Sequence, residues 1–132
     1  MHPDPQPNVP APLGPYSPFV QAGPLLFLSG QTPVDPSTGK LVEGDLGTQT
    51  TQALKNLDAV LRGAGATWAS VVKTTVFLRD MADFQAMNTA YAAFSGSTRP
   101  ARSTIAVAGL PLDARVEIEA VAFISPAAPV EG

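Results

Sequence analysis

The chain contains no cysteine and a single histidine, and these two shortages exclude several chemistries. Without cysteine there is no disulfide, no thiolate zinc site, no cysteine nucleophile and no iron–sulfur cluster. His2 follows the first methionine in a proline-rich stretch, so neither a buried Ser-His-Asp triad nor a histidine metal cluster is expected. Acid–base chemistry in this chain therefore has to use Asp, Glu, Tyr, Lys or bound water.

Charge is also scarce. Charged residues make up 14% of the 132 residues and hydrophobic residues 45%, whereas about a quarter of a typical globular chain is charged. This shortage hints that part of the surface is covered by other copies of the chain. The 8 basic and 11 acidic residues give a net charge of −3, and no basic run occurs. We therefore expect no nucleic-acid-binding face.

Export and membrane signals are missing from the sequence. Residues 1–15 have neither the basic nor the apolar region of a signal peptide, and no apolar run approaches the about 20 residues of a membrane span. We therefore expect a cytoplasmic protein with no membrane partner.

The length fits one domain over residues 1–132. Seven of the 14 prolines lie in residues 1–18, which predicts an extended arm, flexible over 1–13, and residues 125–132 read as a loose tail.

The residues between these ends predict five strands and two helices. Strands are expected at residues 19–22, 25–30, 71–78, 103–108 and 115–124. Asp45 is a good N-cap for a helix that runs to about Gly63, and Asp80 or Asp83 caps a second helix. That helix has a core-facing stripe of Phe84, Met87, Tyr91 and Phe94. The order β-β-α-β-α-β-β predicts an α+β fold, with one sheet and two helices on one face.

The last predicted strand is informative because neither of its faces is polar throughout. One face consists of Val116, Ile118, Ala120, Ala122 and Ile124, and the other of Glu117, Glu119, Val121 and Phe123. A sheet covered on one side normally has a polar outer face. Here the second face starts acidic and becomes apolar, so we expect another subunit to bury part of it, with two carboxylates beside that interface.

Arg102 and Glu117 are the clearest candidates for chemistry. Each lies near the start of a predicted strand, and a short connection joins the two strands. If the strands are neighbours, both side chains lie at one end of the sheet. The guanidinium would then grip a carboxylate ligand, and the glutamate would hold or deprotonate a water. The alternative, which spacing alone favours, is a structural salt bridge between the two.

Several segments together resemble the RidA (YjgF/YER057c/UK114) family of reactive enamine/imine deaminases. They are Ser29-Gly30-Gln31, Val72-Lys73-Thr74-Thr75-Val76, Asn88 to Tyr91, Pro100-Ala101-Arg102-Ser103 and Val116-Glu117-Ile118-Glu119-Ala120. The resemblance covers nearly all of residues 14–124, and its most specific part is Pro-Ala-Arg-Ser followed, fifteen residues after the arginine, by a glutamate. It implies a chorismate-mutase-like fold and a homotrimer with clefts between subunits.

The resemblance also implies an activity. It is the hydrolysis of 2-aminoacrylate and related 2-imino acids, which leak from pyridoxal-phosphate enzymes, to 2-keto acids and ammonia, with no cofactor and no metal. By position, Arg102 would hold the substrate carboxylate, and Glu117 would activate the attacking water, with Glu119 as the alternative acid. Further residues implied at the pocket are Tyr16, Ser29, Gly30, Asn88 and Thr104. Packing in the core or between subunits is an equally good expectation for Tyr16.

The chain departs from the family pattern at the cleft. Thr104 stands where many members have cysteine, Ser95 stands where a second aromatic often follows Phe94, and the segment 94–102 is shorter than in many relatives. These changes are expected to reshape the cleft mouth.

Two other functions remain as alternatives. One is a regulatory or chaperone-like trimer that binds a keto acid without turnover. The other is the endoribonuclease activity described for some relatives, which the acidic composition does not favour.

Overall fold

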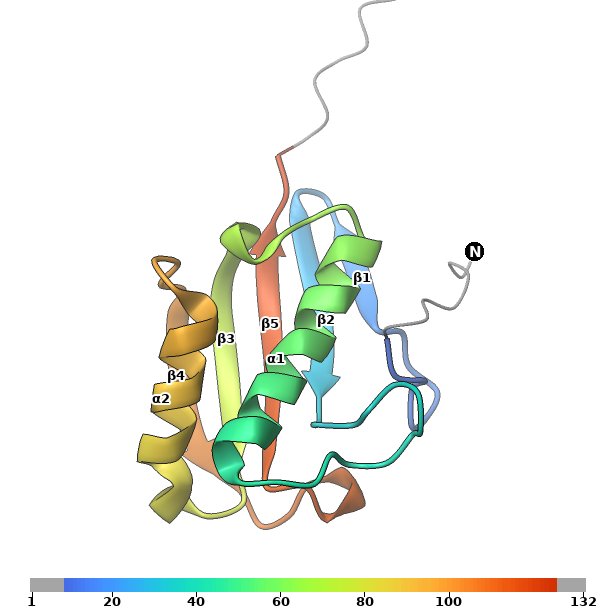
Figure 1. Cartoon of the computed structure of the whole chain (residues 1–132). Helices are drawn as coiled ribbons and strands as arrows, with labels where there is room; N and C mark the ends of the chain where they lie inside the picture. Colours follow the sequence, from blue (N-terminus) through green and yellow to red (C-terminus); the bar gives the residue numbers. More distant parts are fainter. Residues whose placement is uncertain (1–8, 126–132) are drawn as a thin grey trace, which may run out of the picture.

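The computed structural model describes residues 9–125, which form one five-stranded sheet and two α-helices (Figure 1). The elements are β1 (Phe19–Ala22), β2 (Leu25–Gln31), α1 (Leu46–Gly63), β3 (Val71–Leu78), α2 (Phe84–Ser95), β4 (Ala101–Ala106) and β5 (Val116–Phe123). Short 3-10 turns precede β3, α2 and β5. The predicted order is confirmed, although β4 begins and ends two residues before the expected 103–108 strand. Most of the predicted arm and tail lies outside the described residues.

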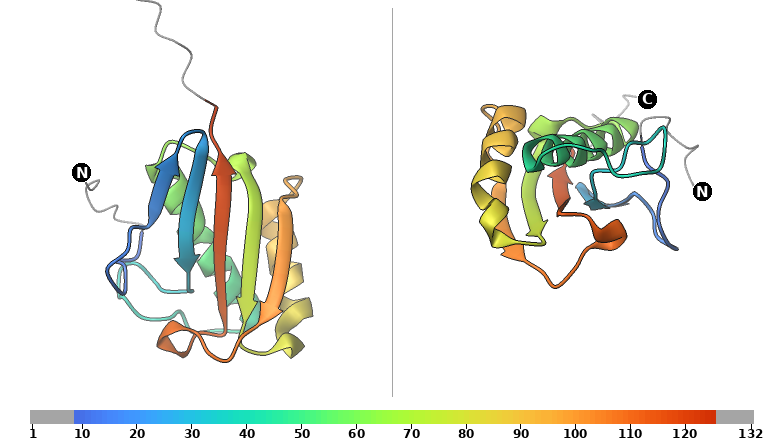
Figure 2. Two further views of the ribbon diagram at one scale, coloured as in Figure 1. Left: turned by 180° about the vertical axis from the view of Figure 1, so that it is seen from behind. Right: turned by 60° about the horizontal axis from the view of Figure 1, so that its bottom comes forward.

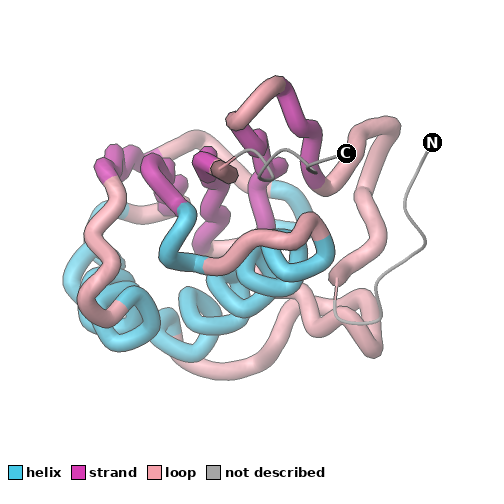
Figure 3. Tube along the Cα trace, turned by 90° about the horizontal axis from the view of Figure 1, so that it is seen from above, coloured by secondary structure: helices cyan, strands magenta, loops and turns pink. Residues whose placement is uncertain are grey.

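The sheet and the helices form two layers. The strand order is β1-β2-β5-β3-β4, and β3 and β4 are the one parallel pair among the described strands. Parallel neighbours need a crossover, which α2 provides between them. Both helices cover the same face of the sheet, as predicted (Figures 1 and 3), and the view from behind shows the strands uncovered (Figure 2). Within residues 9–125 neither helix is long and apolar enough to cross a membrane.

Aspartate caps set where the helices begin. The Asp45 carboxylate accepts a hydrogen bond of 2.8 Å from the Thr48 backbone N–H, which confirms it as the N-cap of α1. Of the two candidates for the second helix, Asp83 stands at the N-cap position of α2 but makes no capping hydrogen bond, whereas Asp80 caps the 3-10 turn that leads into α2 by accepting from the Ala82 N–H at 2.9 Å. Asp83 instead accepts a hydrogen bond from Arg115.

The hydrophobic core lies between the sheet and the helices. On β5, Val116, Ile118, Ala120 and Ala122 are at most 3% exposed, which confirms the predicted alternation. Trp68 is buried and packs edge-on against Tyr91 and Phe94, with ring centroids 6.4 and 5.2 Å apart. The largest fully buried side chains are Leu26, Leu54, Leu57, Leu61, Leu78, Met87 and Ile118.

The other side of the sheet, here called the open face, carries uncovered apolar side chains. Its large exposed members are Val20, Phe27, Ile105 and Phe123. Strand register groups them, because Val20 pairs with Phe27, Leu25 pairs with Phe123, and Ile105 pairs with the half-buried Phe77. Exposed apolar side chains grouped on one face of a folded chain are typical of an interaction site.

A buried asparagine attaches the segment between β2 and α1 to the helix layer. Asn56 is 1% exposed, and its Nδ2 donates to the Thr32 carbonyl at 3.1 Å and the Val34 carbonyl at 2.8 Å. Its Oδ1 accepts from Gln52 Nε2 at 2.9 Å. This one side chain therefore satisfies the buried Val34 carbonyl and gives the Thr32 carbonyl a second donor besides the Val34 N–H.

We predict that Asn56→Ala lowers the free energy of unfolding by about 2–4 kcal/mol, because the buried Val34 carbonyl loses its donor and the Thr32 carbonyl keeps only the Val34 N–H. Urea denaturation at a fixed protein concentration measures this loss. Gln52→Ala is the matched control, since it removes a single partly exposed hydrogen bond and should cost less than about 1 kcal/mol. Equal losses in the two variants would contradict the role given to Asn56.

Candidate active site

The edge strand β4 places Arg102 on the helix-covered side of the sheet. Its cross-strand partner Thr74 is fully buried on that side. Arg102 Nη2 donates to Asn88 Oδ1 of α2 at 2.6 Å, and its guanidinium carbon lies 4.9 Å from the centroid of the Tyr91 ring and 5.8 Å from that of Phe84. The cation is thus oriented by an amide and two aromatic faces, and it forms no ion pair with a carboxylate of residues 9–125.

Tyr91 forms the base on which Arg102 lies. Its hydroxyl shares a 2.7 Å hydrogen bond with Thr74 Oγ1. Burial raises the pKa of Tyr91, although the Thr74 hydrogen bond and the charges of Arg102 and Arg99 act in the opposite direction. Tyr91 is therefore a neutral phenol at neutral pH, and it orients the guanidinium without competing for its charge.

A pocket of about 440 Å³ opens beside Arg102. We call it the arginine pocket, and it is lined by Asn88, Tyr91, Ala92, Arg99, Pro100 and Arg102. The structure thus brings together two of the residues that the sequence singled out, Asn88 and Arg102. The sequence analysis did not identify Arg99 as a site residue. The signal that could have indicated it is its place directly before the Pro-Ala-Arg-Ser segment. Thr104 follows Arg102 by two residues on the same side of β4, opposite Val76, but does not line the pocket.

Glu117 lies on the open face, in the middle of the sheet. It is half-buried and pairs with Phe77 of β3. A Cβ atom added at Gly30 would lie 2.5 Å from Glu117 Oε2, so the absence of a side chain there is what lets the carboxylate lie against β2. Burial raises the pKa of Glu117, and the nearby charge of Glu119 raises it further. A glutamate whose pKa is moved toward neutrality is suited to general acid–base work.

Three further candidates are Ser29 and Glu119, which lie on the Glu117 side of the sheet, and Tyr16, which lies in the segment before β1. Ser29 Oγ donates to the Ser17 carbonyl at 2.7 Å, which holds the end of the proline-rich arm against β2 beside Gly30. Tyr16 is 47% exposed, and its hydroxyl accepts from the Leu13 N–H at 3.2 Å. It therefore does not pack in the core of the chain, and its place at a cleft stays a prediction. Glu119 is exposed on the same face as Glu117.

Two expectations about Arg102 and Glu117 are wrong for a single chain. Their strands are not neighbours, because β3 lies between β4 and β5. Arg102 pairs with Thr74 and Glu117 with Phe77, so the two residues stand three positions apart along β3 and on opposite faces. They share no end of the sheet and form no salt bridge. The ion pairs among residues 9–125 are Arg62–Asp58, Arg79–Asp113 and Arg115–Asp83.

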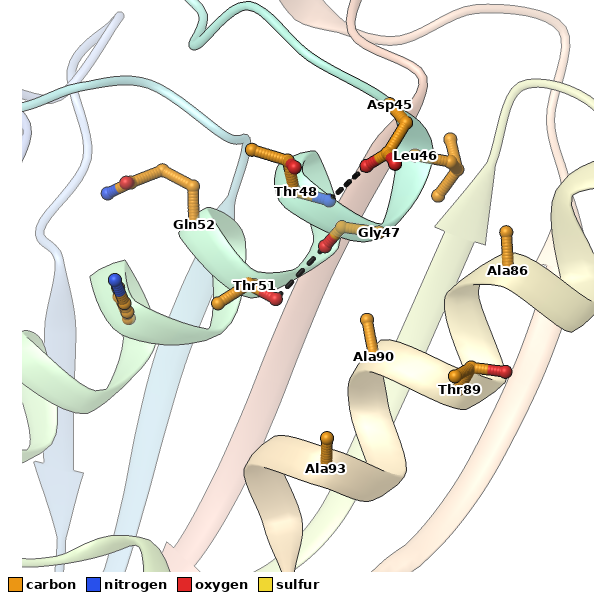
Figure 4. Close-up of a pocket in the computed structure, with 11 residues that line it drawn as sticks. Asp45, Leu46, Gly47, Thr48, Thr51, Gln52, Ala86, Thr89, Ala90 and Ala93 are labelled. Atoms are coloured by element: carbon orange, nitrogen blue, oxygen red, sulfur yellow. Dashed lines mark hydrogen bonds between the residues drawn. The ribbon is translucent and has the colours of Figure 1, made fainter.

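A larger cavity of about 670 Å³ lies between α1 and α2 and contains none of the expected site residues (Figure 4). Its polar groups are already used by the helices. Thr51 Oγ1 donates to the Gly47 carbonyl, Thr89 Oγ1 donates to the Gln85 carbonyl, and Asp45 caps α1. Residues 9–125 also contain no cluster of three side chains suited to hold a metal ion. The chemistry therefore concentrates at the arginine pocket and at Glu117.

Known proteins similar to this chain span almost its whole described length. A family profile described as Endoribonuclease L-PSP matches residues 6–124. A RutC family protein of Pyrococcus horikoshii is 48% identical over 116 residues, which are 88% of this chain and 92% of that protein. The 2-iminobutanoate/2-iminopropanoate deaminase of Mus musculus is 47% identical over 119 residues, 90% of this chain and 88% of the other. The crystal structure of E. coli TdcF with bound serine matches with a TM-score of 0.86 at 38% identity, over 91% and 96% of the two chains.

We predict that the Glu117 carboxyl titrates above the ordinary range of a glutamate, and that Glu119→Gln lowers its pKa only in part because burial is the larger cause. A carboxyl whose pKa is raised by folding stabilises the fold below its unfolded pKa and loses that contribution as the pH rises through its folded pKa. Glu117→Gln should therefore gain stability relative to wild type as the pH rises above the ordinary pKa of a glutamate. Carboxyl NMR titration and urea denaturation measure the two effects, and a Glu117 pKa at or below that of an unfolded peptide would refute the assignment.

Proposed function

This chain belongs to the endoribonuclease L-PSP family, also called the RidA or YjgF family, and we propose that it hydrolyses 2-imino acids to 2-keto acids and ammonia. The observation that carries the proposal is Arg102, a guanidinium oriented in an open pocket by Asn88 and Tyr91 with no carboxylate against it. The relative of this chain from Mus musculus is named 2-iminobutanoate/2-iminopropanoate deaminase. The enamine 2-aminoacrylate, released by pyridoxal-phosphate enzymes, and the 2-imino acids formed by tautomerisation of such enamines are the substrates we expect.

Arg102 selects for a carboxylate. The contact with Asn88 occupies one amino group of the guanidinium, so other N–H groups remain for a paired grip on a planar anion. A simple imine without a carboxylate gains nothing from this contact, whereas every 2-imino acid does. TdcF was solved with serine bound, and serine carries an α-carboxylate of the same kind, which supports this choice of ligand class.

A site that uses both Arg102 and Glu117 requires two copies of the chain. In one copy the two side chains lie on opposite faces of the sheet. The open face, with its exposed apolar side chains, supplies a surface for association. We therefore propose the homotrimer implied by the resemblance. In each cleft the arginine pocket of one subunit faces Glu117, Gly30 and Tyr16 of its neighbour.

The reaction needs water and one proton relay. Arg102 holds the carboxylate, and Glu117 removes a proton from a water that attacks the carbon of the protonated imine, which gives a neutral carbinolamine. The protonated Glu117 then returns the proton to the amino group, the C–N bond breaks as ammonia leaves, and the Glu117 carboxylate takes the hydroxyl proton as the keto group forms. The raised pKa of Glu117 suits both proton transfers near neutral pH. Imines hydrolyse readily, so positioning accounts for the acceleration.

The two other candidate functions make different demands. An endoribonuclease needs a basic surface, whereas the open face presents Glu117 and Glu119 and the chain has a net charge of −3. A trimer that only binds a keto acid would use Arg102 but would not need Glu117. The two side chains therefore separate binding from catalysis.

We predict that Arg102→Ala lowers kcat/KM roughly 100-fold, because it removes a charge-assisted bidentate contact. Glu117→Gln should lower kcat by about 100-fold or more and leave the binding of a 2-keto acid intact. An amino-acid oxidase generates the imino acid in situ, and its decay is followed with each protein. Arg62→Ala is the matched control, since that arginine is exposed on α1 and pairs only with Asp58. If the wild type accelerates the decay of none of the alanine-, leucine- and serine-derived imines, the deaminase proposal fails.

We predict that the two inactive variants complement each other. Co-expressed Arg102→Ala and Glu117→Gln chains form some clefts that take Arg102 from one subunit and Glu117 from the other, so about a quarter of the clefts in a random mixture become active. Each variant expressed alone should remain inactive. Activity that stays at the level of the single variants, in oligomers shown by mass spectrometry to be mixed, would place both residues of a site in one chain and contradict the assembly.

A further inference from the structure

The arginine pocket contains a second cation that the proposed reaction does not use. Arg99 lines the pocket together with Arg102, and no carboxylate is among the lining residues. Neither arginine takes part in an ion pair within the part of the chain that the structure describes. A monocarboxylic substrate neutralises one of the two charges, which leaves the other without a role.

The segment that carries Arg99 is attached to the core. Ser95, at the end of α2, is 5% exposed, and its Oγ accepts from Trp68 Nε1 at 2.9 Å and donates to the Thr98 carbonyl. The Thr98 N–H also donates to the Ser95 carbonyl at 3.1 Å. Gly96, with a φ of 60°, allows the tight turn between them. The chain is therefore fixed at Thr98, immediately before Arg99.

Pro100, the residue after Arg99, restricts the backbone of Arg99 on its C-terminal side. A proline disfavours the helical conformation of the residue that precedes it, so Pro100 keeps the backbone of Arg99 extended until β4 begins at Ala101. The Arg99 side chain itself is exposed, but its charge reaches the pocket, since it acts on the Tyr91 phenol beside Arg102. Arg99 thus projects from a fixed point at the rim of the pocket.

We propose that Arg99 binds a second carboxylate and makes 2-imino dicarboxylic acids of four or five carbons the preferred substrates. This inference deepens the proposed function and rests on it. Arg102 holds the α-carboxylate at the base of the pocket, and Arg99 pairs with the distal carboxylate at the rim. The pocket, at about 440 Å³, lies within the size range of small-molecule sites. Two positive charges with no acid among the lining residues of the pocket favour a dianion over a monoanion by direct Coulomb attraction.

The first experiment compares two imines. Aspartate oxidase acting on aspartate supplies 2-iminosuccinate, an amino-acid oxidase acting on alanine supplies 2-iminopropanoate, and kcat/KM is measured for each. Arg99→Gln should lose about 5- to 10-fold on the dicarboxylic imine and less than 2-fold on the other, as expected for an exposed charge-assisted contact. Arg99→Lys should keep most of the preference. Arg62→Gln removes the same charge at a residue that does not line the pocket, and it should change neither value.

The second experiment measures binding without turnover, so that the two proposals fail separately. Calorimetry compares 2-oxoglutarate with 2-oxobutanoate, and the wild type should bind the dicarboxylate more tightly. Arg99→Gln should abolish that difference, and added salt should reduce it. If no imine is hydrolysed but this difference persists, the deaminase proposal fails and the role of Arg99 stands. Equal effects of Arg99→Gln on both ligands, or a wild type that prefers the monocarboxylate, would overturn the role of Arg99.

Discussion

The position of β3 between β4 and β5 is the constraint on which the candidate site depends. Each residue of β4 or β5 that pairs with a residue of β3 lies on the same face of the sheet as that residue. Arg102 pairs with Thr74 and lies on the helix-covered side, whereas Glu117 pairs with Phe77 and lies on the open face. A shift of one residue in either pairing would exchange the faces. The chain therefore builds two half-sites, and any chemistry that needs both residues is tied to association of the chain with itself.

Local patterns account for what could be predicted from the sequence. The Asp45 cap, the apolar stripe of α2 and the alternation on β5 depend on neighbours a few residues away, and all three are confirmed. The relation of Arg102 to Glu117 depends on strand order and register, which short-range spacing does not encode, and the prediction that they share one end of the sheet is wrong. Arg99 could not be predicted as a site residue, because a charged loop residue belongs to no periodic pattern. Only its position in the lining of the arginine pocket identifies it.

Burial links the open face to the acidity of Glu117. Gly30 allows the carboxylate to lie against β2, and the desolvation this causes is the main reason why its pKa is raised. A second subunit packed on the apolar part of the open face would remove more water from the same carboxylate. Association would therefore act on the pKa of Glu117 in two opposite ways, because desolvation raises it whereas the arginines of the neighbouring pocket would lower it. A separated subunit would lack both influences and would present an incomplete cleft.

The two arginines of the pocket are held in different ways, and this difference divides their roles. Arg102 is clamped by Asn88 and by the Tyr91 ring, so its guanidinium has one orientation and selects a planar carboxylate. Arg99 is fixed only through its backbone, by the attachment of Thr98 to Ser95, and its side chain remains free to follow a ligand. A rigid inner cation and an adjustable outer one would make the α-carboxylate obligatory while tolerating distal acids of different length. Ser95, which forms the attachment to Trp68, is where the family pattern often has an aromatic, so this departure of the sequence falls at the residue that positions the outer cation.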